Sequence, residues 1–172
     1  MRNMRSLILG CSVVLLTVVA VMGQRPAPAP DRNADREEIN ALMWKYARAL
    51  DGHDPDAYAA AYTKDGEFRA GAGNPTKGTQ ALKALVQNLK DNDAKRVTAG
   101  ETIAPMYHMT TDSWTEFVDA THAKHYTYWL TVFGAAGRGS TVNVAAAGRG
   151  VDDLVKADGK WLIQVRNVAP QN

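Results

Sequence analysis

Tyr46 and Asp51 are the first side chains along the chain whose types and spacing suggest chemistry. They lie five residues apart in a segment with helical periodicity, which places them roughly 140° apart around a helix axis at about 100° per residue. They can flank one cavity if the helix ends there, and Gly52 followed by His53-Asp54-Pro55 is a stop signal of that kind. A carboxylate at this end opposes the helix dipole. Asp51 therefore has a functional partner, or it is solvated or paired with Arg48.

The N-terminal residues 1–23 have the features of a secretory signal peptide. Arg2 and Arg5 give a charged start, and the apolar stretch from Leu7 to Met22 ends at a small residue, Gly23. An uncleaved anchor is the alternative, although the apolar stretch is short for a membrane span. We expect a periplasmic or secreted protein with no membrane contact beyond this segment.

The rest of the chain has balanced charge. The 172 residues include 20 Lys and Arg and 18 Asp and Glu, and loss of Arg2 and Arg5 with the signal leaves 18 of each sign. No basic surplus then favours nucleic acid as a partner. The one cysteine, Cys11, lies in the signal segment. The remaining chain is expected to have no disulfide and no thiol nucleophile.

Domain organisation follows from a change of composition after the signal. Alternating Pro and Ala in residues 24–30 predict a stiff linker, which we extend to residue 34. Residues 35–170 then form one domain, long enough for a single sizeable core.

The first half of this domain has the patterns of helices. Periodicity predicts a helix over 31–50, and Asp54 before Pro55 is an N-cap signal for a second, short helix. Thr79 is expected to cap a third helix that ends at Lys90. The expected inward-facing residues are Ile39, Leu42, Met43, Tyr46 and Leu50 in the first helix, Tyr58, Ala61 and Tyr62 in the second, and Leu82, Leu85, Val86 and Leu89 in the third.

The second half has the patterns of strands. A turn at 64–66 precedes a short strand at 67–70 and a loop at 71–78, and long β-rich segments follow at 105–118, 123–133, 141–155 and 160–168. We expect a bend or a bulge near Gly148–Gly150. Segregated helices and antiparallel strands indicate an α+β fold. A curved sheet covered by helices leaves a pocket between the two layers.

Several stretches resemble the SnoaL-like branch of the nuclear transport factor 2-like (NTF2-like) superfamily. The N-terminal ones are Ala47–Tyr58, Tyr62–Phe68 and Gly78–Leu82. Met106–Asp112 resembles the family's His-containing strand, and Gly150–Arg166 resembles its terminal hairpin. The similarity covers residues 35–168. It implies a cone-shaped fold in which three N-terminal helices pack on a curved, mainly antiparallel sheet.

The resemblance also implies a site. Scytalone dehydratase and bile acid 7α-dehydratase, which share this fold, use a pocket Tyr, Asp and His, and the bile acid enzyme adds an Arg on the final strand. The corresponding residues here are Tyr46, Asp51, His108 and Arg166. This chain departs from the pattern on the next strand, where dehydratases carry a second acid or His. Alternation there places on one face His125, Thr127, Trp129 and Thr131, with no Asp.

The roles implied are those of cofactor-free proton transfer. His108 would be the general base or acid, Asp51 would orient it, and Tyr46 would donate a hydrogen bond to a substrate oxygen. The alternatives are a hydrogen-bonded core His108 and a core Tyr46. Arg166 would bind an anionic group, or pair with an acid such as Asp112 or Glu101. The other expected substrate-binding residues are His125, Trp129, Tyr62 and Phe68.

We expect no metal and no cofactor, because the histidines lack tight ligand spacing and no Gly-rich phosphate motif opens a helix. His53 and His122 are expected to face solvent, and the four tryptophans to lie in the core or on a dimer surface. The predicted function is a dehydratase-like lyase or isomerase for a small hydrophobic or polycyclic ligand. The alternative is a non-catalytic binding or interaction module, and in either case a homodimer is expected.

Overall fold

The computed structural model describes residues 31–170, so the predicted signal peptide and residues 24–30 of the linker lie outside the described residues. Its helices are α1 (Asn33–Asp51), α2 (Pro55–Ala60) and α3 (Thr79–Thr98). Its strands are β1 (Tyr62–Arg69), β2 (Thr76–Lys77), β3 (Met106–Phe117), β4 (His122–Phe133), β5 (Asn143–Ala157) and β6 (Lys160–Asn167). None of these helices combines the length and the apolar character needed to cross a membrane.

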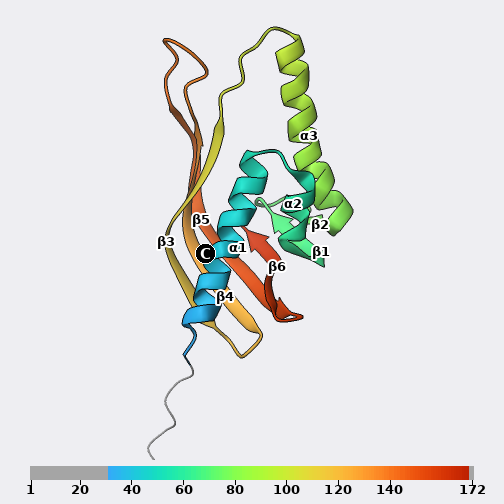
Figure 1. The fold of residues 1–172 in the computed structure, drawn as a ribbon, viewed down its shortest axis with the longest axis vertical. Helices are drawn as coiled ribbons and strands as arrows, with labels where there is room; N and C mark the ends of the chain where they lie inside the picture. Colours follow the sequence, from blue (N-terminus) through green and yellow to red (C-terminus); the bar gives the residue numbers. More distant parts are fainter. Residues whose placement is uncertain (1–30, 171–172) are drawn as a thin grey trace, which may run out of the picture. The chain divides into compact units, whose positions relative to one another are not determined.

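The strands form one curved, six-stranded sheet in the order β2-β1-β6-β5-β4-β3 (Figure 1). Every neighbouring pair is antiparallel except β1 and β6, which run parallel. Because of this parallel pair, β1, which comes first among the strands in the chain, lies beside β6, the last strand. Both strands lie next to the helices. The predicted α+β, NTF2-like architecture is confirmed.

The core lies between α1 and the sheet. The predicted apolar face of α1 is buried, and α1 packs against β3 and β6. Burial of one large aliphatic side chain stabilises the fold by roughly 1.5–3 kcal/mol. The core residues from other elements include Leu82, Val86, Leu154, Trp161 and Ile163.

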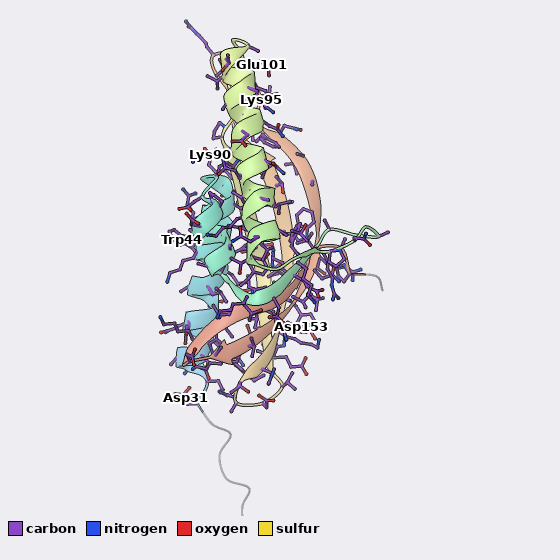
Figure 2. The ribbon with its side chains drawn as sticks, turned by 90° about the vertical axis from the view of Figure 1, so that its right-hand side faces the viewer. Asp31, Trp44, Lys90, Lys95, Glu101 and Asp153 are labelled. Atoms are coloured by element: carbon purple, nitrogen blue, oxygen red, sulfur yellow. The ribbon has the colours of Figure 1, made fainter. Side chains whose placement is uncertain are left out.

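Helix α3 differs from its prediction at both ends. Its N-cap is Gly78, and the Thr79 hydroxyl donates instead to the carbonyl of Lys64 at 3.3 Å. The helix continues past Lys90 to Thr98, because no Gly or Pro interrupts it and Lys95 and Arg96 favour its C-terminal dipole. Figure 2 shows Lys90 and, farther along α3, Lys95. Leu89 is 37% exposed, not buried as predicted.

Strand β1 also differs, since the predicted turn at 64–66 is part of it. The register between β1 and β6 shifts between Tyr62 and Glu67, so residues 64–66 form an irregular part of the strand instead of a turn. Gly66 permits it, because a Cβ there would lie 2.8 Å from Cβ of Tyr62. Of the bend or bulge predicted near Gly148–Gly150, the bulge is wrong. Pairing with β4 is regular there, and the shift occurs at Thr131/Val132.

Candidate active site

The C-terminal residue of α1, Asp51, contacts His108 near the start of β3. Its Oδ1 lies 2.7 Å from Nδ1 of His108 and accepts a hydrogen bond from the His108 backbone N–H at 2.9 Å. The Asp51 side chain is only 6% exposed, and Arg48 is 3.9 Å away. A carboxylate at Nδ1 assigns the proton to that nitrogen, which leaves Nε2 with a free lone pair. The predicted contact between these two residues is confirmed.

His108 opens on a cavity of about 190 Å³ between α1 and the concave face of the sheet. The first helix contributes Tyr46, Ala47 and Leu50 to its wall. The strands and the C-terminal segment contribute Phe68, His108, Thr110, Trp129, Thr131, Ala146, Arg166 and Val168. The cavity therefore brings together five of the predicted site residues: Tyr46, His108, Arg166, Trp129 and Phe68. Asp51 lies behind His108 and does not line this cavity.

Tyr46 is one of three packed tyrosines. Its ring centroid lies 5.2 Å from that of Tyr58 and 6.1 Å from that of Tyr62. The hydroxyls of Tyr58 and Tyr62 are 3.2 Å apart. Burial first, and the neighbouring tyrosines next, raise the pKa of Tyr62 well above its ordinary value, so the phenol stays neutral. Tyr62, expected to bind substrate, lies in the core beneath Tyr46 and does not line the cavity.

Arg166 forms a buried ion pair with Asp152 on the neighbouring strand. The two residues are register partners, and Nη1 of Arg166 donates to Oδ2 of Asp152. Burial alone would lower the pKa of Arg166, but the Asp152 carboxylate raises it overall, so the guanidinium stays charged. Burial raises the pKa of Asp152 to about 6, against the opposing effect of Arg166. The guanidinium also lies 4.5 Å above the ring of Tyr46.

The predicted acidic partners of Arg166 are wrong. Glu101 pairs with Arg96 at 2.8 Å, and Asp112 lies at the irregular part of β3. The analysis of the sequence missed Asp152. Counting back from the turn at Asp158-Gly159 with regular pairing would have placed Val151 opposite Arg166. A register shift between Asp153 and Leu154 brings Asp152 there instead, so hairpin counting alone could not have found this partner.

His125 lies deeper than predicted. It is 2% exposed, it does not line the cavity, and its Nδ1 is 2.9 Å from the hydroxyl of Thr115. Burial, and then the charge of Arg166, lower the pKa of His125 to about 4. Strand pairing aligns Thr115, His125, Asp152 and Arg166 across four strands. This polar row lies in the interior of the fold, and His125 is neutral at pH 7.

Trp129 forms one wall of the cavity and is fixed in place. Its indole N–H donates to the carbonyls of Arg149 and Val168 at 3.1 and 3.0 Å. Its ring lies so close to Gly148 that a Cβ there would be 2.6 Å from Cζ2. This contact, rather than a bulge, explains a glycine at position 148.

The remaining histidines and tryptophans lie elsewhere. His122 is exposed beside Asp119, and His53 is 3.6 Å from Asp93. Trp44 is 65% exposed on the outer side of α1 (Figure 2), Trp114 is also exposed, and Trp161 is in the core. Within residues 31–170, no three His, Cys, Asp or Glu side chains gather as metal ligands would.

A larger groove of about 740 Å³ lies on the other side of Asp51. It shares no wall residue with the cavity. Its residues include the apolar Ile103, Met106 and Phe133 and the charged Asp93 and Arg96.

Known protein structures share this fold at low sequence identity. A variant of Rv3472, a protein of unknown function from Mycobacterium tuberculosis, is 24% identical with a TM-score of 0.64, covering 81% of this chain and 73% of that one. An NTF2-like protein with a cystatin-like fold from Novosphingobium aromaticivorans is 19% identical with a TM-score of 0.64, covering 81% and 83%. A protein from the same species, described as "Putative Scytalone Dehydratase", is 21% identical with a TM-score of 0.60, covering 78% and 82%.

No functionally curated protein matches the sequence significantly. The family model described as the SnoaL-like domain matches residues 31–167, which is most of the chain. The protein therefore belongs to the SnoaL-like family, and it has the fold of the NTF2-like protein described above.

Proposed function

We propose that the protein is a cofactor-free acid–base enzyme, a lyase or isomerase of the dehydratase type, acting on a small hydrophobic compound. One observation carries the proposal. A His–carboxylate pair with 2.7 Å between Nδ1 and Oδ1 opens on a cavity that Tyr46 and Arg166 also line. Proton donors and acceptors that face one cavity are what an enzyme needs and a simple scaffold does not.

The chemistry follows from the positions of the groups. Nε2 of His108 takes a proton from a carbon next to a carbonyl, and Asp51 stabilises the imidazolium that forms. Tyr46 and Arg166 stabilise the negative charge that develops on the carbonyl oxygen. In an elimination, the imidazolium returns its proton to the departing hydroxyl, which leaves as water. In an isomerisation, it returns the proton to another carbon. A positioned base of this kind accelerates a reaction by roughly 10²–10⁴-fold.

The description of one protein with the same fold agrees with this class of reaction. A neighbour described as "Putative Scytalone Dehydratase" covers 78% of this chain at 21% identity. At this identity the likeness shows the fold, so the reaction rests on the geometry of Asp51 and His108.

Substitution of His108 tests the proposal. The wild type, His108→Ala and His122→Ala are compared for turnover of β-hydroxycarbonyl compounds and β,γ-unsaturated ketones. His122 also contacts a carboxylate, that of Asp119, at 2.9 Å, but on the surface, so it is a matched control. We expect His108→Ala to lose turnover by at least about 10²-fold with an unchanged circular dichroism spectrum. Equal loss in both variants, or no loss in either, would contradict the proposal.

The alternative function is a ligand-binding or interaction module without catalysis. One observation favours it. The face of the sheet opposite the cavity exposes large apolar side chains, including Tyr107, Met109, Tyr128 and Val144. Such a patch is typical of a protein interface, and we propose that it forms a homodimer. Light scattering at micromolar concentration tests this, and a monomeric mass would contradict it.

We also propose that the protein is periplasmic or secreted, because residues 1–23 have the pattern of a signal peptide. Cell fractionation with N-terminal sequencing tests this. A cytoplasmic protein that keeps residues 1–23 would contradict it.

A further inference from the structure

The charges around the cavity are not those of an anion-binding site. Arg166 is the one cation in the cavity wall, and its charge is neutralised by Asp152, which is fully buried against it. Asp51 adds a second carboxylate behind His108. With His108 neutral, as a base must be, the inner groups Arg166, Asp152 and Asp51 sum to a net negative charge. Arg48 offsets this weakly, since its side chain is 55% exposed and 3.9 Å from Asp51.

Arg166 nevertheless lines the cavity, where a ligand can meet it. Its Nη1 is used by Asp152, but its Nε–H is buried and has no hydrogen-bond partner within residues 31–170. A buried donor without a partner costs roughly 1–3 kcal/mol. This Nε–H has no accessible surface, and Oδ1 of Asp152 is likewise buried without a partner within residues 31–170, so a ligand meets only the part of the guanidinium that lines the cavity. A neutral oxygen there can accept a hydrogen bond without bringing in another negative charge.

The size of the cavity limits the ligand. Its volume is about 190 Å³, and an apolar cavity of roughly 150 Å³ in a protein core holds benzene. Pockets for drug-sized ligands have volumes of about 300–1,000 Å³. One ring with a small substituent fits within this volume, whereas a fused ring system exceeds it and would have to extend out on the side where Thr110 and Ala146 are exposed. The large neighbouring groove lies beyond Asp51 and does not extend the cavity wall.

We infer that the substrate is a neutral carbonyl compound about the size of one ring, whose oxygen accepts a hydrogen bond from Arg166, and that Asp152 sets this preference by neutralising Arg166. This inference deepens the proposed function and rests on it, because a bound compound is a substrate only if the protein is an enzyme. It also replaces the expectation that Arg166 binds a carboxylate or phosphate, and the expectation of a polycyclic ligand.

Binding of three probes tests the inference without any turnover. Acetophenone is neutral with one ring, benzoate is its anionic counterpart of similar size, and 2-acetonaphthone has a second, fused ring. We expect acetophenone to bind at least about tenfold more tightly than either of the others at pH 7.5, which corresponds to roughly 1.4 kcal/mol. Benzoate binding as tightly as acetophenone would overturn the charge argument. Equal binding of 2-acetonaphthone would overturn the size argument.

Two variants assign the preference to the ion pair. Asp152→Asn keeps the shape of the side chain and leaves Arg166 uncompensated, so the preference should shift at least about tenfold toward benzoate. If this variant does not fold, the double variant D152L/R166M replaces the pair by apolar groups of similar volume, a change that proteins often tolerate. It should bind acetophenone about tenfold more weakly. Unchanged binding in the variant that folds would overturn the inference.

His108→Ala separates this inference from the proposed function. The variant should keep the order of affinities while losing turnover. Preference for acetophenone without any turnover in the wild type would leave the ligand class in place and contradict the enzyme. Turnover confined to anionic substrates would support the enzyme and contradict the inferred ligand class.

Discussion

Asp51 contacts His108 twice through one carboxylate oxygen, which is 2.7 Å from the ring Nδ1 and 2.9 Å from the backbone nitrogen. The two contacts fix both the ring and the strand that carries it. They also explain why an acid occupies the C-terminus of α1, where the helix dipole disfavours it. The carboxylate is stabilised by donors from β3 rather than by solvent.

Asp51→Asn should lower turnover by at least about 10²-fold, because a neutral amide stabilises the imidazolium less and can present either its oxygen or its NH₂ group to Nδ1, so the ring is no longer held in one tautomer. The ¹⁵N chemical shifts of His108 measure this directly. They should show a proton on Nδ1 in the wild type and a mixture of tautomers in the variant. Asp119→Asn, in the exposed pair with His122, is the control and should leave turnover unchanged. A wild-type tautomer in Asp51→Asn would show that Asp51 does not position the ring.

The stability of the protein should fall between pH 7 and pH 5 because of His125. Burial lowers the folded-state pKa of this histidine to about 4, whereas the unfolded chain takes up the proton near pH 6.5. At His125 the unfolded state therefore binds more protons in this window, which lowers the free energy of unfolding by about 2 kcal/mol. Asp152 acts in the opposite direction, because its folded-state pKa of about 6 lets the folded protein take up a proton in the same window, and this offsets about 1 kcal/mol of the drop. Urea titrations at the two pH values measure the drop.

Two variants of equal charge change isolate this effect. His125→Gln should lose this drop and, with Asp152 still titrating, become slightly more stable at pH 5 than at pH 7, although it is less stable than the wild type at pH 7. His122→Gln should retain the wild-type dependence. An equal slope in all three proteins would mean that another group is responsible.

Gly148→Ala should disturb the cavity through Trp129. The added Cβ would lie 2.6 Å from the indole, so the ring or the strand must move, at a cost of about 1–3 kcal/mol in the free energy of unfolding. Acetophenone binding should weaken as well, since Trp129 lines the cavity. Gly73→Ala adds a Cβ with no atom within 4 Å, and should change neither property. Equal behaviour of the two variants would exclude a special role of this contact.

Leu82→Ala should destabilise the fold by about 2–5 kcal/mol, because Leu82 is fully buried between α3 and the rest of the core. Leu89→Ala on the same helix should cost under about 1 kcal/mol, because Leu89 is 37% exposed. Thermal and urea unfolding measure both. Comparable losses would mean that Leu89 is covered in solution, as it would be by a partner.

Local chemistry in the sequence determined the class of the fold and the ends of several elements. Apolar periodicity marked the buried face of α1, and Asp54 caps α2 as predicted, accepting from Ala57 N–H at 2.9 Å. These features depend on residues a few positions apart, so a linear pattern carries them. Where a local signal was weak, as in the last turns of α3 and in β1, packing and register decided the boundary.

The tertiary structure alone decided which groups meet at the cavity. Asp51 and His108 are far apart in the chain, and their contact depends on how α1 lies across β3. Alternation predicted the face of His125, but not that it lies below the cavity rather than in its wall. The partner of Arg166 depended on the register of β5 and β6. A sequence specifies residue types and local spacing, whereas the neutral or charged character of a site depends on long-range contacts that form only when the sheet closes on its helices.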